Sequence, residues 1–170
     1  MGFLATSIVF LRKYGYNLWL WFDLMMPSIL FGLIILQLAN FMMQFSLGTP
    51  LGLDIPNDHS LAEYVEYRYR PTGFEAYQYF QPVALYQAFA YSIVFMISVL
   101  CLLINRKYKF LAEGTVFLFS VILMAIIRFG IGFMYFSVNK DMLLYPMQWI
   151  ALTVMIATVF IYVVKRFQHN

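Results

Sequence analysis

The chain has 170 residues, of which 63% are hydrophobic and 20% aromatic, and only 11% are charged. That charged share is less than half of what a soluble domain usually carries, and a water-soluble fold of this length cannot bury so much apolar surface. The composition therefore excludes a soluble protein and predicts an integral membrane protein. The formal net charge of +3 says little about partners, because in a membrane protein the location of charge matters more than its total.

The residues that usually hold metals and cofactors are sparse. Cys101 is the one cysteine and lies within an apolar run, so the sequence offers neither a disulfide framework nor a thiolate metal site. His59 and His169 lie far apart, and no cluster has the spacing of metal ligands. The sequence also lacks a glycine-rich phosphate loop and a nucleic-acid motif. We therefore expect no metal, no cofactor and no nucleic-acid partner.

The first apolar stretch, residues 1–11, ends at "RKYG". It is too short to cross a bilayer alone, since a helical span needs roughly 20 residues. We expect a short apolar helix, either half a span or a span completed by its neighbours. A cleavable signal peptide is the alternative, but the basic residues follow the apolar stretch instead of preceding it, and no small-x-small cleavage site follows.

Four longer runs are apolar enough to cross a membrane as helices. They cover residues 18–45, 83–104, 115–136 and 143–164. The first contains Asp23 and Pro27, and the third contains Arg128. We therefore predict an all-α integral membrane protein, a polytopic bundle forming one domain over residues 1–170, with the loop 46–82 as a cap.

The distribution of basic residues predicts the orientation of the bundle. If all four runs cross, one side carries Arg12, Lys13, Arg106, Lys107, Lys109, Lys165 and Arg166. The opposite side carries Arg68, Arg70 and Lys140. The first group is predicted to be cytoplasmic, which places the C-terminus in the cytoplasm and loop 46–82 outside. The tyrosines of this loop alternate partly with charges, which fits either a short strand or an irregular cap.

A row of amides lies at the end of the first run, in "LQLANFMMQFSLGTP". Gln37, Asn40 and Gln44 follow an i, i+3, i+7 pattern and share one face of a helix. Polar groups within a membrane are costly unless they find partners. The row fits hydrogen bonds between helices, worth about 0.6–2 kcal/mol each, or a cavity that binds a lipid headgroup.

Arg128 lies in the middle of the third run, in "LMAIIRFGIGF". A central arginine costs about 2.5–3.5 kcal/mol on insertion scales, and its planar donors suit a phosphate or a carboxylate. Asp23 is a candidate partner, although it lies near the cytoplasmic end of its own span. Gly130 and Gly132 would allow close approach of a helix or an acyl chain. We expect Arg128 to lie near a lipid phosphate or an acidic partner, within reach of the Asn40 face.

Several segments together resemble one known family. They are "MGFLATSIVFLRKYG", "DLMMP", "LQLANFMMQFSLGTP", "GLDIPNDH" followed by "FQPVALYQ", and the positions Gly114, Arg128 and Gln148. In this order and spacing they resemble the bacterial prolipoprotein diacylglyceryl transferases. Enzymes of that family move diacylglycerol from phosphatidylglycerol to the cysteine thiol of a lipoprotein precursor. The likeness covers nearly the whole chain and corresponds to the later two-thirds of the family's seven-span fold, so the early helices are expected to be absent.

The resemblance also assigns residues. Asn40 and Gly48 stand at the family's signature asparagine and glycine, and Arg128 stands at its late arginine. Other family positions are changed in this chain. The signature arginine is Gln37, the signature glutamate is Phe45, the glutamate after the late arginine is Gly132, and the histidine and glutamate of the outer turn are Gln81 and Gln87.

These changes remove the groups that the transfer reaction needs. Attack by a thiol requires a base to take its proton and cations to stabilise the departing phosphate ester. The sequence therefore predicts a non-catalytic relative that serves as a structural or lipid-binding subunit of a larger complex in the bacterial inner membrane. The residues expected to hold a phosphatidylglycerol-like headgroup are Gln37, Asn40, Gln44 and Arg128. The alternative is an active transferase completed by another chain; a channel or transporter is disfavoured because no inverted repeat is visible.

Overall fold

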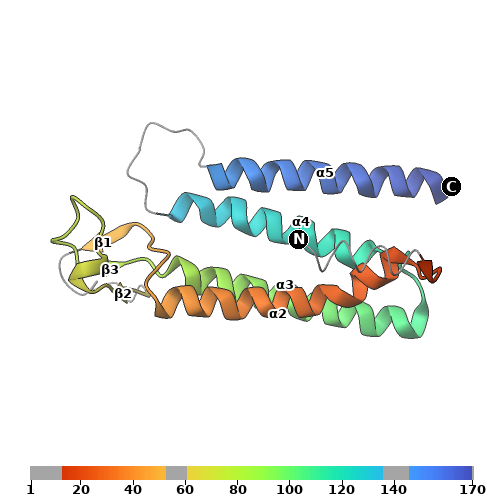
Figure 1. Cartoon of the computed structure of the whole chain (residues 1–170), viewed down its shortest axis with the longest axis horizontal. Coiled ribbons are helices and arrows are strands. Elements are labelled where there is room, and N and C mark those ends of the chain that lie inside the picture. Colours follow the sequence, from red (N-terminus) through yellow and green to blue (C-terminus); the bar gives the residue numbers. More distant parts are fainter. Residues whose placement is uncertain (1–12, 53–60, 136–145, 170) are drawn as a thin grey trace.

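The computed structural model describes residues 13–52, 61–135 and 146–169, and four long helices account for most of them (Figure 1). Helix α2 covers Leu18–Met42, α3 covers Val83–Tyr108, α4 covers Thr115–Ile131 and α5 covers Pro146–His169. A short 3-10 helix, η2 (Gly132–Met134), follows α4 directly. All four helices are long and apolar enough to span a membrane. The predicted four-span helical membrane fold is thus confirmed, whereas residues 1–11 lie outside the described part of the chain.

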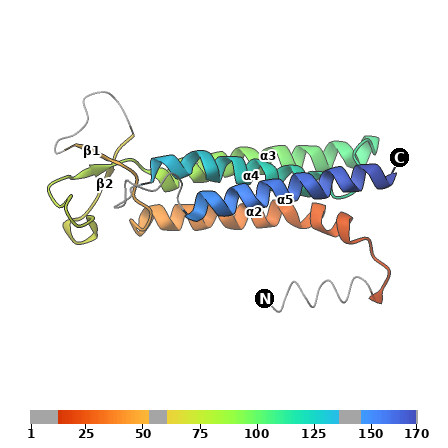
Figure 2. The same ribbon diagram turned by 90° about the horizontal axis from the view of Figure 1, so that it is seen from above.

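The helices run side by side and alternate in direction (Figures 1 and 2). Helix α2 packs along α3, and α4 packs against both α3 and α5. As a result, the end of α2, the start of α3, the end of α4 and the start of α5 meet at one end of the bundle. A small β-sheet lies at this end, which we call the sheet end.

Several helix boundaries differ from the predicted ones. Helix α4 ends at Ile131, with η2 reaching Met134, instead of residue 136, and α5 continues to His169 instead of residue 164. Helix α2 stops at Met42 instead of residue 45, and Gln44 adopts a left-handed backbone with φ 53°. Helix α3 continues to Tyr108 and ends at Lys109, whose N–H donates to the carbonyl of Asn105. Basic residues in the last turn of a helix interact favourably with its free carbonyls, which explains why the helix extends beyond the apolar run. The predicted start of the fourth run, residue 143, is outside the described residues.

The cap contains three very short antiparallel strands. They are β1 (Pro50–Gly52), β2 (Glu63–Tyr64) and β3 (Tyr79–Phe80), with β3 in the centre. A 3-10 turn, η1 (Tyr67–Tyr69), lies between β2 and β3 in sequence. Arg70 ties this loop together, because it donates from Nε to the Val65 carbonyl at 3.0 Å and from Nη1 to the Glu75 carbonyl at 2.9 Å. The cap is therefore partly a sheet and partly irregular.

The interior of the bundle is apolar, with small polar contacts between helices. Met26, Leu30 and Val94 form its buried centre, surrounded by partly buried side chains of α3 and α4. The rings of Phe22 and Phe117 stack with centroids 5.0 Å apart. The hydroxyls of Ser98 and Ser120 lie 2.7 Å apart and hydrogen-bond across α3 and α4. Close packing and such bonds hold helices together where lipid removes the usual hydrophobic driving force.

Asp23 is buried on α2 and contacts the start of α4. Its carboxylate accepts the N–H of Gly114 at 2.6 Å and the N–H of Phe117 at 2.7 Å. These N–H groups belong to the first turn of α4, where no carbonyl within the helix can accept them. Arg128 lies in the last turn of the same helix, roughly 20 Å further along at 1.5 Å per residue. The suggested pairing of Asp23 with Arg128 is therefore not formed.

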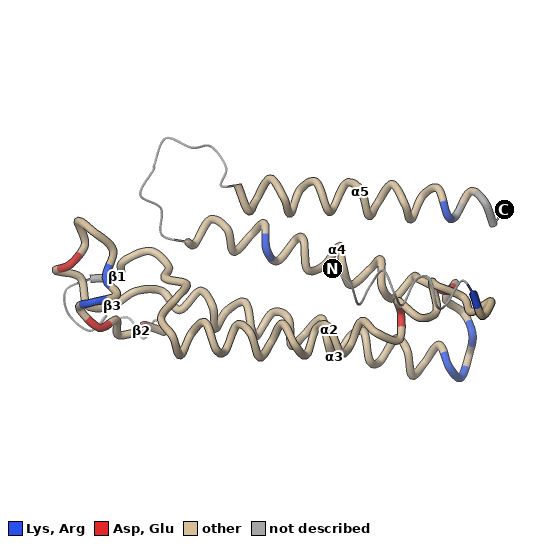
Figure 3. The backbone as a smooth tube through the Cα atoms, viewed as in Figure 1, with Lys and Arg blue, Asp and Glu red and all other residues tan. Residues whose placement is uncertain are grey.

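Charged residues lie mainly towards the two ends of the bundle (Figure 3). Among the described residues, the basic ones near the end opposite the sheet are Lys13, Arg106, Lys107, Lys109 and Lys165, whereas the basic residues of the cap are Arg68 and Arg70. This separation matches the grouping from which the orientation was predicted. The orientation itself stays a prediction.

Candidate functional site

The amide row divides at the end of α2. Asn40 donates to the side-chain oxygen of Gln37 at 3.3 Å, and Gln37 is buried. Gln44 lies beyond the helix, where it donates to the Tyr64 carbonyl at 2.8 Å and accepts the N–H of Glu66 at 3.2 Å. Gln37 and Asn40 therefore share a helix face as predicted, but Gln44 joins the helix to the cap.

Arg128 lines a hollow at the sheet end of the bundle with a volume of about 450 Å³. The other described lining residues are Ser46, Gly132, Tyr135, Pro146 and Met147. Arg128 donates to the thioether sulfur of Met147 at 3.8 Å, which is a weak acceptor. No carboxylate of the described residues forms an ion pair with it. Its guanidinium is thus a cation beside a hollow with most of its donors available to a ligand.

A chain of hydrogen bonds connects this hollow to the buried start of α3. The hydroxyl of Tyr135 donates to Gln87 Oε1 at 3.0 Å. Gln87 is buried and donates from Nε2 to the Tyr91 hydroxyl at 2.7 Å. Gln87 therefore orients Tyr135, which forms one wall of the Arg128 hollow.

Two glycines permit close packing at the same end. A Cβ on Gly48 would lie 2.5 Å from Val83 Cγ2 and 2.6 Å from the Gln81 carbonyl oxygen. A Cβ on Gly132 would lie 2.6 Å from Cγ of Gln148. These contacts bring the segment after α2 against the start of α3, and η2 against the start of α5. The walls of the Arg128 hollow come from those segments, so the glycines help to shape it.

A second, shallower hollow adjoins the first and shares Ser46 and Tyr135 with it. Gln44 and Phe45 line this second hollow, whereas Gln37 and Asn40 do not line either one. The sequence interpretation missed Ser46, Tyr135 and Met147. Tyr135 follows α4 and η2 in an extended conformation, so helical spacing from Arg128 could not have predicted its position.

Comparison with known proteins now identifies the family. A model of the prolipoprotein diacylglyceryl transferase family matches residues 1–164. The chain belongs to this family. One curated relative is the phosphatidylglycerol–prolipoprotein diacylglyceryl transferase of Shouchella clausii (strain KSM-K16), which is 28% identical over 169 residues, or 98% of this chain. The chain spans 57% of the length of that relative, and no solved structure matches it.

Membership of the prolipoprotein diacylglyceryl transferase family confirms the resemblance drawn from the motifs. With a bacterial relative and four apolar helices, the chain is a multi-pass protein of the bacterial inner membrane. The structure places Asn40, Gly48 and Arg128 at the sheet end of the bundle. Gln87 and Gly132, which stand where the resemblance expects glutamates, lie at the same end. The positions related to the family's chemistry therefore gather in one region.

Proposed function

We propose that this chain binds the headgroup of an anionic, phosphatidylglycerol-like phospholipid without transferring its diacylglycerol. The observation that carries the proposal is the position of Arg128 beside a hollow of about 450 Å³, with no ion pair to a described carboxylate. A guanidinium binds a phosphate through paired hydrogen bonds, and the apolar surroundings strengthen that interaction. Gln44 lines the adjoining hollow and would add polarity near the headgroup, whereas Gln37 and Asn40 line neither hollow.

Loss of catalysis is proposed from the three positions where the resemblance expects glutamates. The side chain of Phe45 is 80% exposed and has no group that accepts a proton. The space beside Gly132 is filled by Gln148. Gln87 is an amide held between two tyrosine hydroxyls, and an amide is not a base at neutral pH. None of the three residues can take a proton from an attacking thiol.

A lipid-retention measurement tests the headgroup site. The protein is placed in nanodiscs of phosphatidylglycerol and phosphatidylcholine with identical acyl chains, and the lipids released with it are counted by native mass spectrometry. We expect Arg128→Gln to lower the preference for phosphatidylglycerol about fivefold, since one basic group near an anionic lipid is worth about 1 kcal/mol. Arg68→Gln is the control, because Arg68 already pairs with Glu66 at 2.9 Å. Equal preference in wild type and Arg128→Gln would refute the site.

We also propose that the protein works as a subunit of a larger membrane assembly, with its C-terminus in the cytoplasm. Helix α5 packs mainly against α4 and leaves a broad apolar face, which includes Ile156, Phe160 and Phe167. That face offers room for a further helix. Purification in mild detergent followed by native mass measurement tests this, and a lone monomer would contradict it.

A C-terminal alkaline phosphatase fusion tests the orientation, because this enzyme is active only outside the cytoplasm. The proposed cytoplasmic C-terminus therefore predicts an inactive fusion.

The second candidate is a working diacylglyceryl transferase completed by another chain. The family match and the curated relative favour it. Incubation with phosphatidylglycerol and a peptide that contains a lipoprotein-type cysteine decides between the two. We expect no thiol-linked diacylglycerol above the level of an Arg128→Ala variant. A clear excess over that variant would establish the enzyme and end the non-catalytic proposal.

A further inference from the structure

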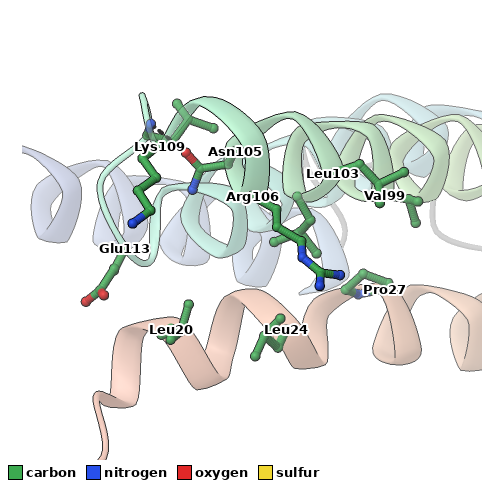
Figure 4. A pocket seen from close by; sticks show the side chains of 11 residues that line it. Leu20, Leu24, Pro27, Val99, Leu103, Asn105, Arg106, Lys109 and Glu113 are labelled. Carbon is green, nitrogen blue, oxygen red and sulfur yellow. Dashed lines mark hydrogen bonds between the residues drawn. The ribbon is translucent and has the colours of Figure 1, made fainter.

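A larger groove lies between α2 and α3 at the end of the bundle opposite the sheet (Figure 4). Its volume is about 700 Å³, within the range of roughly 300–1,000 Å³ typical of small-molecule sites. Its lining residues come from α2, α3 and the turn that leads into α4, and they include Leu24, Leu103, Arg106, Lys109, Leu111 and Glu113. The groove is thus remote from the Arg128 hollow and shares no residue with it.

The walls of the groove are mostly aliphatic and open to the side. Leu24 and Leu103 face each other across it from α2 and α3 and are 60% and 59% exposed among the described residues. In a membrane-spanning helix, such a surface contacts the acyl region of the bilayer. A groove open on its lipid side accepts an acyl chain directly from the leaflet.

Two cations lie where the groove reaches the end of the bundle. Figure 4 shows the side chain of Arg106 extending from α3 towards α2, with Lys109 nearer the turn. Within the described residues, neither side chain forms a hydrogen bond or an ion pair. The lining contains one carboxylate, Glu113, which accepts a hydrogen bond from Asn17, so two formal positive charges there face one formal negative charge. The charge left for a ligand at this end is therefore positive.

The turn that carries Lys109 is held in a fixed shape. Lys109 has a left-handed backbone with φ 49°, and its N–H donates to the Asn105 carbonyl at 2.8 Å. The side-chain oxygen of Asn105 accepts the N–H of Leu111 at 2.8 Å. These bonds fix the backbone of the turn, so that Lys109 and Leu111 both line the groove. Preformed geometry of this kind lowers the entropic cost of binding.

We propose that this groove binds one anionic phospholipid, with an acyl chain along the leucines and the phosphate against Arg106 and Lys109. An apolar wall that ends in two unpaired cations complements a phospholipid, because one such molecule carries both an acyl chain and a negative charge. Such basic pockets between membrane helices suit anionic headgroups. The proposal does not rest on the Arg128 hollow, and it concerns the opposite end of the bundle.

Photocrosslinking tests the groove in the full-length protein. Nanodiscs contain a trace of phosphatidylglycerol with a diazirine in its acyl chain, or the matching phosphatidylcholine, and labelled peptides are mapped by mass spectrometry. We expect phosphatidylglycerol to label the peptides that contain Leu24 and Leu103. Arg106→Gln with Lys109→Gln should lower that labelling about 30-fold, because two basic groups at about 1 kcal/mol each contribute about 2 kcal/mol. Lys107→Gln is the matched control, because Lys107 does not line the groove.

A second variant tests the apolar wall separately. Leu24→Trp should fill the groove and lower labelling of the Leu103 peptide while Arg106 and Lys109 both remain. Labelling that is equal for the two lipids, or lowered as much by Lys107→Gln as by the double substitution, would overturn the proposal. Absence of lipid labelling at both peptides would also overturn it and would indicate that another segment of protein occupies the groove. Arg128→Gln should leave this labelling unchanged, which separates the two sites.

Discussion

The carboxylate of Asp23 accepts the backbone N–H of Gly114 at 2.6 Å, so a residue of α2 caps α4, whose N-cap residue Gly114 lies 91 residues further along the chain. Gly114 has a left-handed backbone with φ 81°, and a Cβ there would lie 2.5 Å from Cε3 of Trp19 and 2.8 Å from Nζ of Lys165. Glycine is the residue that accepts both the backbone conformation and the crowding. The start of α4 is therefore defined by residues of α2 and α5.

Asp23→Ala removes the acceptor of two N–H groups in apolar surroundings. An unsatisfied buried donor costs about 1–3 kcal/mol, so we expect the free energy of unfolding to fall by about 2–4 kcal/mol. Asp23→Asn keeps one side-chain oxygen and should lose less. Denaturation in mixed micelles, followed by circular dichroism, measures both. Glu66→Ala, which removes an exposed ion pair worth at most about 1 kcal/mol, is the control, and an equally small effect of Asp23→Ala would contradict the capping role.

Gly130 and Gly132 form a matched pair for testing the packing of η2 on α5. Gly132→Ala forces Cβ to within 2.6 Å of the buried Gln148 side chain, so we expect a loss of about 1–3 kcal/mol. Gly130 has no atom within 4 Å of the corresponding position. Gly130→Ala should therefore be neutral or stabilise by up to about 1 kcal/mol through helix propensity. Unfolding midpoints of the two variants compare them, and a similar change in both would exclude the steric explanation.

Gln87 satisfies two tyrosine hydroxyls in the interior. Gln87→Leu keeps a similar volume but leaves the hydroxyls of Tyr91 and Tyr135 without this partner, so we expect a loss of about 2–4 kcal/mol. Tyr135 also lines the Arg128 hollow, and its reorientation should weaken lipid retention. Gln81→Leu is a nearby control, because Gln81 is linked through its backbone. Unchanged stability of Gln87→Leu would show that the hydroxyls find other partners.

Glu63 makes the stability of the cap depend on pH. Burial raises the pKa of its carboxyl from 4.5 to about 7, and the side chain is 6% exposed. The folded protein therefore binds a proton more tightly than the unfolded chain, so stability is highest below about pH 4.5 and declines until about pH 7. We expect a decline of the order of 2 kcal/mol.

Unfolding midpoints at pH 5 and pH 8 check this dependence. Glu63→Gln should flatten it, because the amide stays neutral throughout. Glu75→Gln is the control for a carboxylate in the same cap, since the N–H of Gly73 lowers the pKa of Glu75 and its titration lies at more acidic pH. A pH slope that survives in Glu63→Gln would assign it to another group.

The membrane spans were predictable because hydropathy is a local property. The starts of α3 and α4 agree with the predicted residues 83 and 115, each directly after a Pro or Gly that interrupts a helix. The end of α2 was missed by three residues. It depends on Gln44, whose left-handed backbone is stabilised by bonds to Tyr64 and Glu66 in the cap. Contacts between segments distant in sequence are not encoded in hydropathy.

Residues of the site were predictable only where a polar or charged side chain lies within an apolar run. Arg128 was found because a charge in an apolar run is costly, and the Gln37–Asn40 bond follows from their spacing on a helix. Ser46 and Met147 gave no such signal, since both are ordinary neutral residues brought to Arg128 from other segments. The partners of Asp23 were also not predictable, because a sequence does not show which backbone N–H groups a carboxylate accepts.

The residues that surround Gly114 are made at different times during synthesis of the chain. Trp19 lies in the first described helix, Gly114 at the start of the third, and Lys165 near the end of the last, with its ammonium 4.3 Å from the centre of the Trp19 ring. Because synthesis proceeds from the N-terminus, α2, α3 and α4 are made before Lys165. The contacts around Gly114 are therefore complete only once translation has passed Lys165 in α5.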